Sequence, residues 1–360
     1  MRLLFVCTAP GGGGLEIHFV ALANAMHEAG HEVSVFVRRG DRIDQLLDAG
    51  IDRHYGIFRG AADPRGLWRL SRTVRRVRPD WMIGSLSKEY WPITLIGRRK
   101  RVPVVLFKHT ATIMRRGSRK LLPGMVARFV VISDYMREYY IEQGIPAERV
   151  RVLHNLFDFA RYRRDDGVRR RERQRLSLAD EDVLVGFVGG FTRGKGILVL
   201  GEALNQAMER NPNIHGWWIG GGPEEAELRQ LIDRGGHAAR HHFHGWAEDS
   251  APLYSAMDLL ALPSIGTETF GRVCVEAEAA GVAVLGSDLG GIPETMADGI
   301  SGRLLPPGDV AAWRDAILDL AADPALRARM GEAGRQFVGQ RFSAAAIVDQ
   351  FVELLQDPAR

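Results

Sequence analysis

The 360-residue sequence has only two cysteines, Cys7 and Cys274. They lie far apart in the chain, and neither stands in a spacing used for metal ligation. This scarcity argues against a disulfide-stabilised secreted domain and predicts a reducing compartment. No apolar run approaches the ~20 residues of a membrane span, and no signal peptide is recognisable before the first apolar segment. We therefore expect a cytoplasmic protein, with association at the inner face of the cell membrane left open.

Two nucleotide-binding motifs are incomplete. Glycines 11–14 follow the apolar segment 1–7, but Glu16 or His18 stands where a dinucleotide-binding Gly-x-Gly-x-x-Gly needs its last glycine. The segment from Gly189 to Lys195 has Walker A spacing, yet position 196 is glycine where Mg²⁺ binding needs serine or threonine. The sequence thus argues against a dinucleotide-binding enzyme and a P-loop ATPase.

Metal and nucleic-acid signatures are also lacking. The only Asp-x-Asp, at 180–182, precedes a predicted strand and is badly placed to ligate an ion bound to a substrate. No recognised nucleic-acid-binding module is present, and basic residues are scattered over several segments. We expect neither an essential metal or other cofactor nor a nucleic-acid partner.

The composition is typical of a soluble globular protein, but charged residues are distributed unevenly between the two halves of the chain. Hydrophobic residues make up 46% and charged residues 26% of the chain, which is long enough for two ordinary domains. Residues 1–180 hold 34 Lys and Arg against 19 Asp and Glu, a net charge of +15. Residues 181–360 hold 14 against 25, a net charge of −11. The two halves are therefore expected to meet different partners.

Two basic segments stand out in the first half. Residues 67–80 form an amphipathic helix whose arginines surround an apolar stripe. A second cluster, Arg115, Arg116, Arg119 and Lys120, precedes two leucines. Such segments suit either a solvated helix face or contact with an anionic membrane or acceptor.

A strand–loop–helix pattern recurs in both halves, which predicts two doubly wound α/β domains. The predicted strands end in glycine, histidine or acidic residues. These residues are Gly13, His109, Asp134, Gly190, Gly221, Glu268 and Gly290. Because ligands bind outside the carboxyl ends of strands in open α/β sheets, this bias predicts a ligand cleft between two facing domains.

The richest stretch is Pro263 to Gly281. Glu268 lies in a loop after the apolar run 259–262, whereas Glu276 lies in a helix that Gly271 opens. The free N–H groups of that helix start favour an anion, and carboxylates bind hydroxyls. Apolar neighbours surround Glu276, so its charge must have a partner. The stretch suits a sugar joined to a phosphate.

This stretch resembles a known family. ETFGRVCVE is similar to the Glu-x7-Glu motif of retaining glycosyltransferases of family 4 (glycosyl transferases group 1), and residues 290–294 match the same family. The glycine loop 11–14, the histidine at position 109 and the phosphate loop with Lys195 resemble family features. Where the family usually has arginine this chain has Gly190, so Arg193 is expected to substitute.

The resemblance implies the fold and the domains. It implies an α/β protein of GT-B architecture, with two doubly wound Rossmann-like domains facing across a cleft. Residues 1–160 would bind the acceptor, and residues 165–340 would bind the nucleotide sugar. A helix within 341–360 would pack back towards the first domain.

The implied reaction is metal-independent, hexosyl-type transfer from a nucleotide-diphosphate sugar, with UDP preferred over GDP, to an acceptor hydroxyl with retention of configuration. The acceptor would be an anionic glycolipid or saccharide in bacterial lipopolysaccharide, polysaccharide or glycolipid synthesis. The implied catalytic residues are His109, Arg193, Lys195 and Glu268. The implied donor-binding residues are Gly13, Gly14, Gly190, Gly221, Gly245, Thr269, Phe270, Gly271 and Glu276. A nucleotide-sugar epimerase or phosphorylase of the same fold, or a non-catalytic binding protein, remains an alternative.

Overall fold

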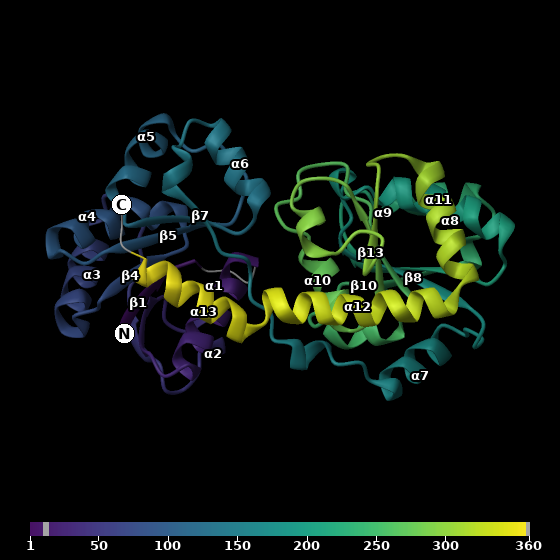
Figure 1. The fold of residues 1–360 in the computed structure, drawn as a ribbon, viewed down its shortest axis with the longest axis horizontal. Coiled ribbons are helices and arrows are strands. Elements are labelled where there is room, and N and C mark those ends of the chain that lie inside the picture. The colour runs from purple at the N-terminus through teal and green to yellow at the C-terminus, as the bar shows by residue number, and fades with distance from the viewer. Residues whose placement is uncertain (10–13, 358–360) are drawn as a thin grey trace. The chain divides into compact units, whose positions relative to one another are not determined.

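The computed structural model describes residues 1–9 and 14–357. The chain forms two compact units (Figure 1). The first consists of Met1–Phe157 together with Phe342–Arg360, and the second is Asp158–Arg341. The chain therefore passes between the units twice.

The first unit is built on a parallel sheet of seven strands. Apolar runs such as Leu3–Cys7 are buried on both faces, as expected for central parallel strands covered by helices. The strand order is β3-β2-β1-β4-β5-β6-β7, so the order reverses between β1 and β4. The strands are β1 (Arg2–Cys7), β2 (Glu32–Val37), β3 (Asp52–Tyr55), β4 (Trp81–Gly84), β5 (Val104–Lys108), β6 (Arg128–Val131) and β7 (Val150–Val152).

Helices connect these strands. The α-helices are α1 (Gly14–Glu28), α2 (Arg42–Leu46), α3 (Pro64–Val77), α4 (Tyr90–Lys100), α5 (Arg116–Met125) and α6 (Asp134–Glu142), and the 3-10 turns are η1 (Ser87–Glu89) and η2 (Ala147–Arg149). The basic helix predicted over 67–80 is α3, but it ends at Val77. Arg78 caps it in the left-handed conformation, with φ at 48°, because the following Pro79 disfavours continued helix.

The last helix, α13 (Ala344–Gln356), completes the core of the first unit. It packs beside α1 (Figure 1), and Ile347, Phe351 and Leu355 join the same buried cluster as Phe107. The ring centroids of Phe107 and Phe351 lie 5.8 Å apart. The residue that leads into α13 is also held to the first unit, since the Phe157 N–H donates to the Phe342 carbonyl at 2.9 Å.

The second unit has a parallel sheet of six strands in the order β10-β9-β8-β11-β12-β13. The strands are β8 (Val183–Gly190), β9 (Ile214–Gly221), β10 (His241–Gly245), β11 (Leu259–Leu262), β12 (Ala283–Ser287) and β13 (Gly302–Leu305). The α-helices are α7 (Asp166–Arg175), α8 (Ile197–Arg210), α9 (Glu225–Arg234), α10 (Arg272–Ala279), α11 (Val310–Ala322) and α12 (Pro324–Phe342). The 3-10 turns are η3 (Phe159–Tyr162), η4 (Arg193–Lys195), η5 (Ala238–Arg240), η6 (Ala251–Ala256) and η7 (Ile292–Thr295).

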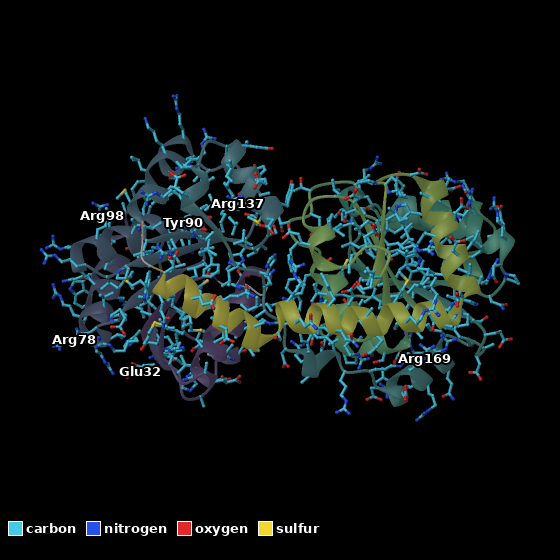
Figure 2. All side chains as sticks on the ribbon, viewed as in Figure 1. Glu32, Arg78, Tyr90, Arg98, Arg137 and Arg169 are labelled. Carbon is cyan, nitrogen blue, oxygen red and sulfur yellow. The ribbon has the colours of Figure 1, made fainter. Side chains whose placement is uncertain are left out.

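The arginine-rich helix α7 is fixed to the rest of the second unit by ion pairs. Arg169, which Figure 2 labels, donates to Asp258 Oδ1 at 2.7 Å, and Arg173 donates to Oδ2 at 2.9 Å. Arg173 is buried, and its guanidinium also donates to the carbonyls of Ala179 and Asp182. Composition alone hides this, because the partner carboxylate lies more than 80 residues away along the chain.

Among the helices that the structure describes, none is long and apolar enough to cross a bilayer.

Candidate active site

Three of the glycines predicted to bind the donor are the last residues of three neighbouring strands in the second unit. Gly190, Gly221 and Gly245 are the last residues of β8, β9 and β10. Next to β8 lies β11, whose following loop carries Glu268. The strand order reverses between β8 and β11, which is where open α/β sheets bind ligands. The sheet therefore gathers these residues at one edge.

Backbone hydrogen bonds join the loops after β8 and β11. The N–H groups of Ile265 and Gly266 both donate to the Gly194 carbonyl, at 2.9 and 2.8 Å. Gly196 has φ at 68°, and a Cβ added there would lie 1.8 Å from the carbonyl oxygen of Pro263. A serine or threonine of a P-loop would not fit at this position. The absent Walker A hydroxyl thus has a local steric cause.

Lys195 and Glu268 form an ion pair across these two loops. The Lys195 ammonium donates to Glu268 Oε2, and the Ser264 hydroxyl donates to the same oxygen at 3.4 Å. About a third of the Lys195 side chain is exposed, whereas Glu268 is mostly buried. The structure thus brings together the predicted phosphate-binding cation and the predicted sugar-binding carboxylate.

The loop that carries Glu268 is held from the neighbouring strand end. Gly291 donates its N–H to the Glu268 carbonyl at 2.9 Å. Gly290 has φ at 61°, and a Cβ there would lie 2.1 Å from the same carbonyl oxygen, so only glycine lets the two segments approach. Thr269 and Phe270 continue the loop to Gly271, which caps α10. The loop therefore delivers Glu268 at the start of a helix, whose N-terminus favours anions.

Glu276 lies in the body of α10, where its carboxylate is buried and accepts three hydrogen bonds from protein donors. Its Oε1 accepts from Arg272 Nε at 2.8 Å and from the Tyr162 hydroxyl at 3.0 Å. Its Oε2 accepts from the Tyr254 hydroxyl at 2.7 Å. Burial and the Glu276 charge raise the pKa of Tyr162 to about 12 and also raise the pKa of Tyr254. Both hydroxyls are therefore protonated and act as donors. The partner that the sequence demanded is thus supplied by the protein, and one of about four lone-pair sites is left for a ligand hydroxyl.

Arg193, the other predicted cation, points towards α9 in this structure. Its guanidinium pairs with the Glu227 carboxylate at 2.9 Å, and both side chains are exposed. An exposed pair of this kind is weak, which leaves the arginine able to change partner.

His109 is buried directly after β5 in the first unit. Its ring lies 4.9 Å from the ring of His18 and stacks on Phe107. Burial and the Lys108 charge lower the pKa of His109 to about 3, so the imidazole is neutral at physiological pH. Its Nε2 has no hydrogen-bond partner among the described residues. A neutral ring with one unengaged nitrogen is suited to a polar, uncharged ligand group.

The loop after β1 is anchored at its start. The Thr8 N–H donates to Glu89 Oε1 at 2.8 Å, and the Thr8 hydroxyl donates to the same oxygen. Glu89 is fully buried, which raises its pKa to about 7. Gly14, a predicted donor-binding residue, begins α1. Gly13, predicted with it, lies outside the described residues.

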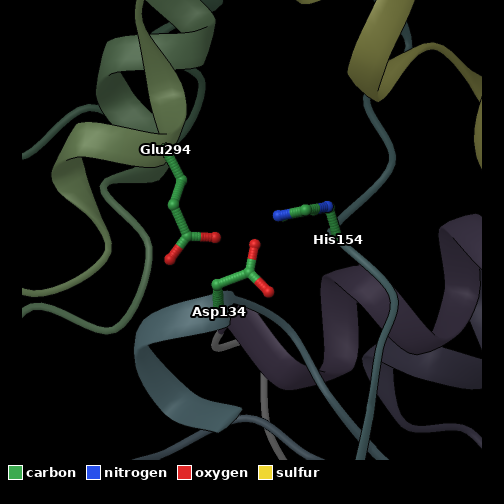
Figure 3. Close-up of side chains that lie close together, drawn as sticks. All are labelled: Asp134, His154 and Glu294. Carbon is green, nitrogen blue, oxygen red and sulfur yellow. The ribbon is translucent and has the colours of Figure 1, made fainter. Parts of the chain in front are cut away.

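Two further strand ends of the first unit carry ionisable groups. Asp134 begins α6 after β6, and His154 follows β7 (Figure 3). Glu294, drawn in the same figure, belongs to η7 of the second unit.

Comparison with known proteins identifies the family. Residues 12–161 match the family model described as Glycosyltransferase Family 4, and residues 168–337 match Glycosyl transferases group 1. A lipopolysaccharide core biosynthesis glycosyltransferase of Rhizobium meliloti is 31% identical over 350 residues, covering 95% of this chain and 94% of that protein. The chain belongs to the group 1, family 4 glycosyltransferases. A second lipopolysaccharide core biosynthesis glycosyltransferase of Rhizobium meliloti is 28% identical over 355 residues, covering 95% and 96%.

Solved structures show the fold of this glycosyltransferase. The crystal structure of HepE of Anabaena in complex with UDP has a TM-score of 0.86 at 23% identity, covering 99% of this chain and 100% of that one. WaaG, a glycosyltransferase involved in lipopolysaccharide biosynthesis, has a TM-score of 0.69 at 17% identity, covering 99% and 100%. The predicted GT-B architecture of two Rossmann-like domains is confirmed, with seven and six parallel strands.

Three residues that hold candidate segments in place could not be anticipated from the sequence. Tyr162 and Tyr254 bind Glu276 from 114 and 22 positions away, and neither belongs to a motif. Glu89 lies between a strand and a helix with no spacing signal, and only the fold brings it to Thr8.

Proposed function

We propose that this glycosyltransferase moves a hexosyl-type sugar from a nucleotide-diphosphate sugar, with UDP preferred, to an acceptor hydroxyl with retention of configuration. The observation that carries the proposal is the Lys195–Glu268 pair at the switch point of the second sheet, beside the start of α10. The names of the Rhizobium meliloti relatives favour lipopolysaccharide synthesis. The structures of HepE, which hold UDP and UDP-glucose, favour a uridine donor.

In the proposed mechanism, charge stabilisation dominates. Negative charge grows on the leaving diphosphate, and Lys195 with the amides near Phe270 and Gly271 stabilises it. Arg193 adds a second cation when it leaves its exposed partner Glu227. The cations and amides neutralise the phosphates, so we propose that no essential metal is needed.

The remaining residues position the sugar. Glu268 and Glu276 accept hydrogen bonds from sugar and ribose hydroxyls, while the glycines at the strand ends allow the backbone to approach the donor. Neutral His109 offers its Nε2 to the transferred sugar. Glu268 is already bound by Lys195 and Ser264, which suits hydroxyl binding better than nucleophilic attack. We therefore propose same-face attack by the acceptor, with the leaving phosphate taking the acceptor proton.

The decisive experiment incubates the purified protein with a panel of UDP- and GDP-sugars. We expect slow hydrolysis of a UDP-sugar without acceptor, unaffected by chelator, and a product with the donor's anomeric configuration when acceptor is added. An epimerised donor or a requirement for inorganic phosphate would instead indicate an epimerase or phosphorylase. Binding without turnover would indicate a non-catalytic binding protein, and an inverted product or metal-dependent rescue would overturn the proposed mechanism.

We also propose that the first unit contacts an anionic membrane through a basic segment that we define as residues 113–121. Arg115 and Arg116 are exposed there, as are Ile113 and Leu121, at 76% and 50%. Arg98 on the neighbouring helix α4 adds a further exposed charge (Figure 2). Apolar side chains among cations are typical of interfacial helices.

Replacing Arg115, Arg116, Arg119 and Lys120 with serine should then reduce binding to anionic vesicles. Each basic residue near the surface contributes about 1 kcal/mol, so binding should fall by a factor of at least 100 at low salt. Co-sedimentation with vesicles of varied anionic lipid content measures this. The matched control changes four exposed arginines of the second unit to serine: Arg170, Arg171, Arg210 and Arg234. Vesicle binding that changes with neither anionic lipid content nor salt would indicate that the basic segment contacts only solvent. An equal loss of vesicle binding in the control variant would indicate the same.

A further inference from the structure

A cavity of about 420 Å³ opens in the first unit beyond the ends of β4 and β5. Three cations, Lys88, Lys108 and Arg115, line it together with the hydroxyl-bearing Ser87, Thr112 and Ser118. No aspartate or glutamate is among its described lining residues. Glu89, the acidic residue of η1, directs its carboxylate to Thr8. The cavity therefore carries an uncompensated positive charge.

Lys108 is the unusual member of this set. Its side chain is 5% exposed, yet within the described ranges it has no carboxylate within 4 Å. Its ammonium donates to the hydroxyls of Thr112, Thr110 and Ser87, at 2.9, 3.3 and 3.4 Å. Neutral hydroxyls do not compensate a buried charge, which normally has an ionic partner. An anion in the cavity would supply the partner that the protein does not.

The rest of the wall is apolar and well supported. Trp91 faces the cavity with Ile113, Met114 and Leu122. The Trp91 indole N–H donates to the Ser118 hydroxyl at 3.0 Å, which fixes the ring across from α5. Tyr90, labelled in Figure 2, is held through its hydroxyl to the Phe107 carbonyl. An aromatic face beside cations is suited to a ring that bears an anionic substituent.

The anion that matches this set is a phosphate ester. It carries a charge of about −1.5 to −2 and three strong acceptor oxygens, whereas a carboxylate carries one charge and two oxygens. Three cations and three hydroxyls exceed what one carboxylate can use. The cavity volume also accommodates a sugar or polyol ring with its phosphate.

We infer that this cavity binds the phosphorylated part of the acceptor, so that the acceptor class is a phosphate ester of a sugar or polyol. Identification of the bound molecule as the acceptor rests on the proposed function, whereas the binding of a phosphate ester does not depend on it. Lys108 would be the central contact, with Lys88 and Arg115 at the mouth, where their side chains are exposed. The hydroxyls of Ser87 and Thr112, which line the cavity and now accept hydrogen bonds from the Lys108 ammonium, would donate to the phosphate oxygens instead.

Titration calorimetry with myo-inositol 1-phosphate and with myo-inositol as probes tests the inference on the full-length protein. We expect the phosphate ester to bind and the free polyol to bind at least 10-fold more weakly. Lys108→Met should weaken phosphate-ester binding by about 10- to 100-fold, as for loss of a hydrogen bond to a charged group. Lys100→Met, at the far end of α4, is the matched control and should bind as the parent does.

If Lys108→Met does not fold, two readouts decide instead. Lys88→Met combined with Arg115→Ser removes exposed cations and should also weaken phosphate-ester binding about 10-fold or more. In the parent protein, the phosphate ester should protect Lys88, which is exposed at the mouth of the cavity, from acetylation, as measured by mass spectrometry. Equal affinity for ester and polyol, or no protection, would overturn the inference. Donor hydrolysis by the same protein sample reports separately on the proposed function, so the two can fail independently.

Discussion

Replacing Lys195 with alanine should slow glycosyl transfer by roughly 10²–10³-fold, as for loss of one preorganised electrostatic donor. Lys195 is the cation that already pairs with Glu268 across the two loops, and its charge matters most as the diphosphate becomes more negative. The effect should appear mainly in kcat, whereas donor affinity should change less. Steady-state kinetics with varied donor concentration separates the two quantities.

The matched control is Arg210→Ala. Arg210 ends the helix that follows the Lys195 loop, and its exposed contact with Asp315 is 3.8 Å long, so its loss should leave the rate unchanged. Lys195→Arg keeps the charge and should recover part of the rate. A Lys195→Ala variant with parental kcat, or one that loses only donor affinity, would contradict the assigned role.

Glu276→Ala should both destabilise the second unit and weaken nucleotide binding. The substitution leaves the Arg272 guanidinium and the hydroxyls of Tyr162 and Tyr254 without their carboxylate. Removal of one member of such a buried cluster costs on the order of 3 kcal/mol in the free energy of unfolding. For a unit of this size that is a fall of roughly 6–12 °C in Tm, measured by calorimetry.

Nucleotide binding distinguishes the ligand role of Glu276 from its structural one. At a temperature where Glu276→Ala is folded, UDP affinity should fall by roughly 1.5–3 kcal/mol, the range for hydrogen bonds to a charged group. Glu209→Ala, at an exposed position near the end of α8, should change neither Tm nor affinity appreciably. A folded Glu276→Ala variant that binds UDP as the parent does would show that the carboxylate serves structure alone.

Local pattern was enough to predict the strands and loops of the central stretch. The apolar run 259–262 is β11, Gly271 caps α10, and Glu276 is buried, because each depends on neighbours within a few residues. Edge strand β3 was not predicted, since its sequence, Asp-Arg-His-Tyr, has neither an apolar run nor alternation. Its strand state depends on pairing with β2.

Side-chain partners were much less predictable than elements. The sequence required a partner for Glu276, yet the two tyrosines come from elements that only the fold brings together. Pairing of Arg193 with Glu227 likewise depends on where α9 lies after β9. Lys108 offered no signal at all, because a lysine at a strand end is normally solvated and its burial follows from the packing of η1 and α5 around it.

The double passage of the chain between the units has a consequence for biosynthesis. Phe342 and the residues of α13 belong to the first unit but are translated after the whole of Asp158–Arg341. At about 5–20 residues per second, the ribosome needs roughly 10–40 s to make that intervening segment. Throughout this interval the apolar surface that later receives Ile347, Phe351 and Leu355 has no cover from its own helix. The second unit, continuous in sequence, is therefore free to fold before the first unit is complete, and during this interval the apolar surface of the nascent first unit is exposed to aggregation.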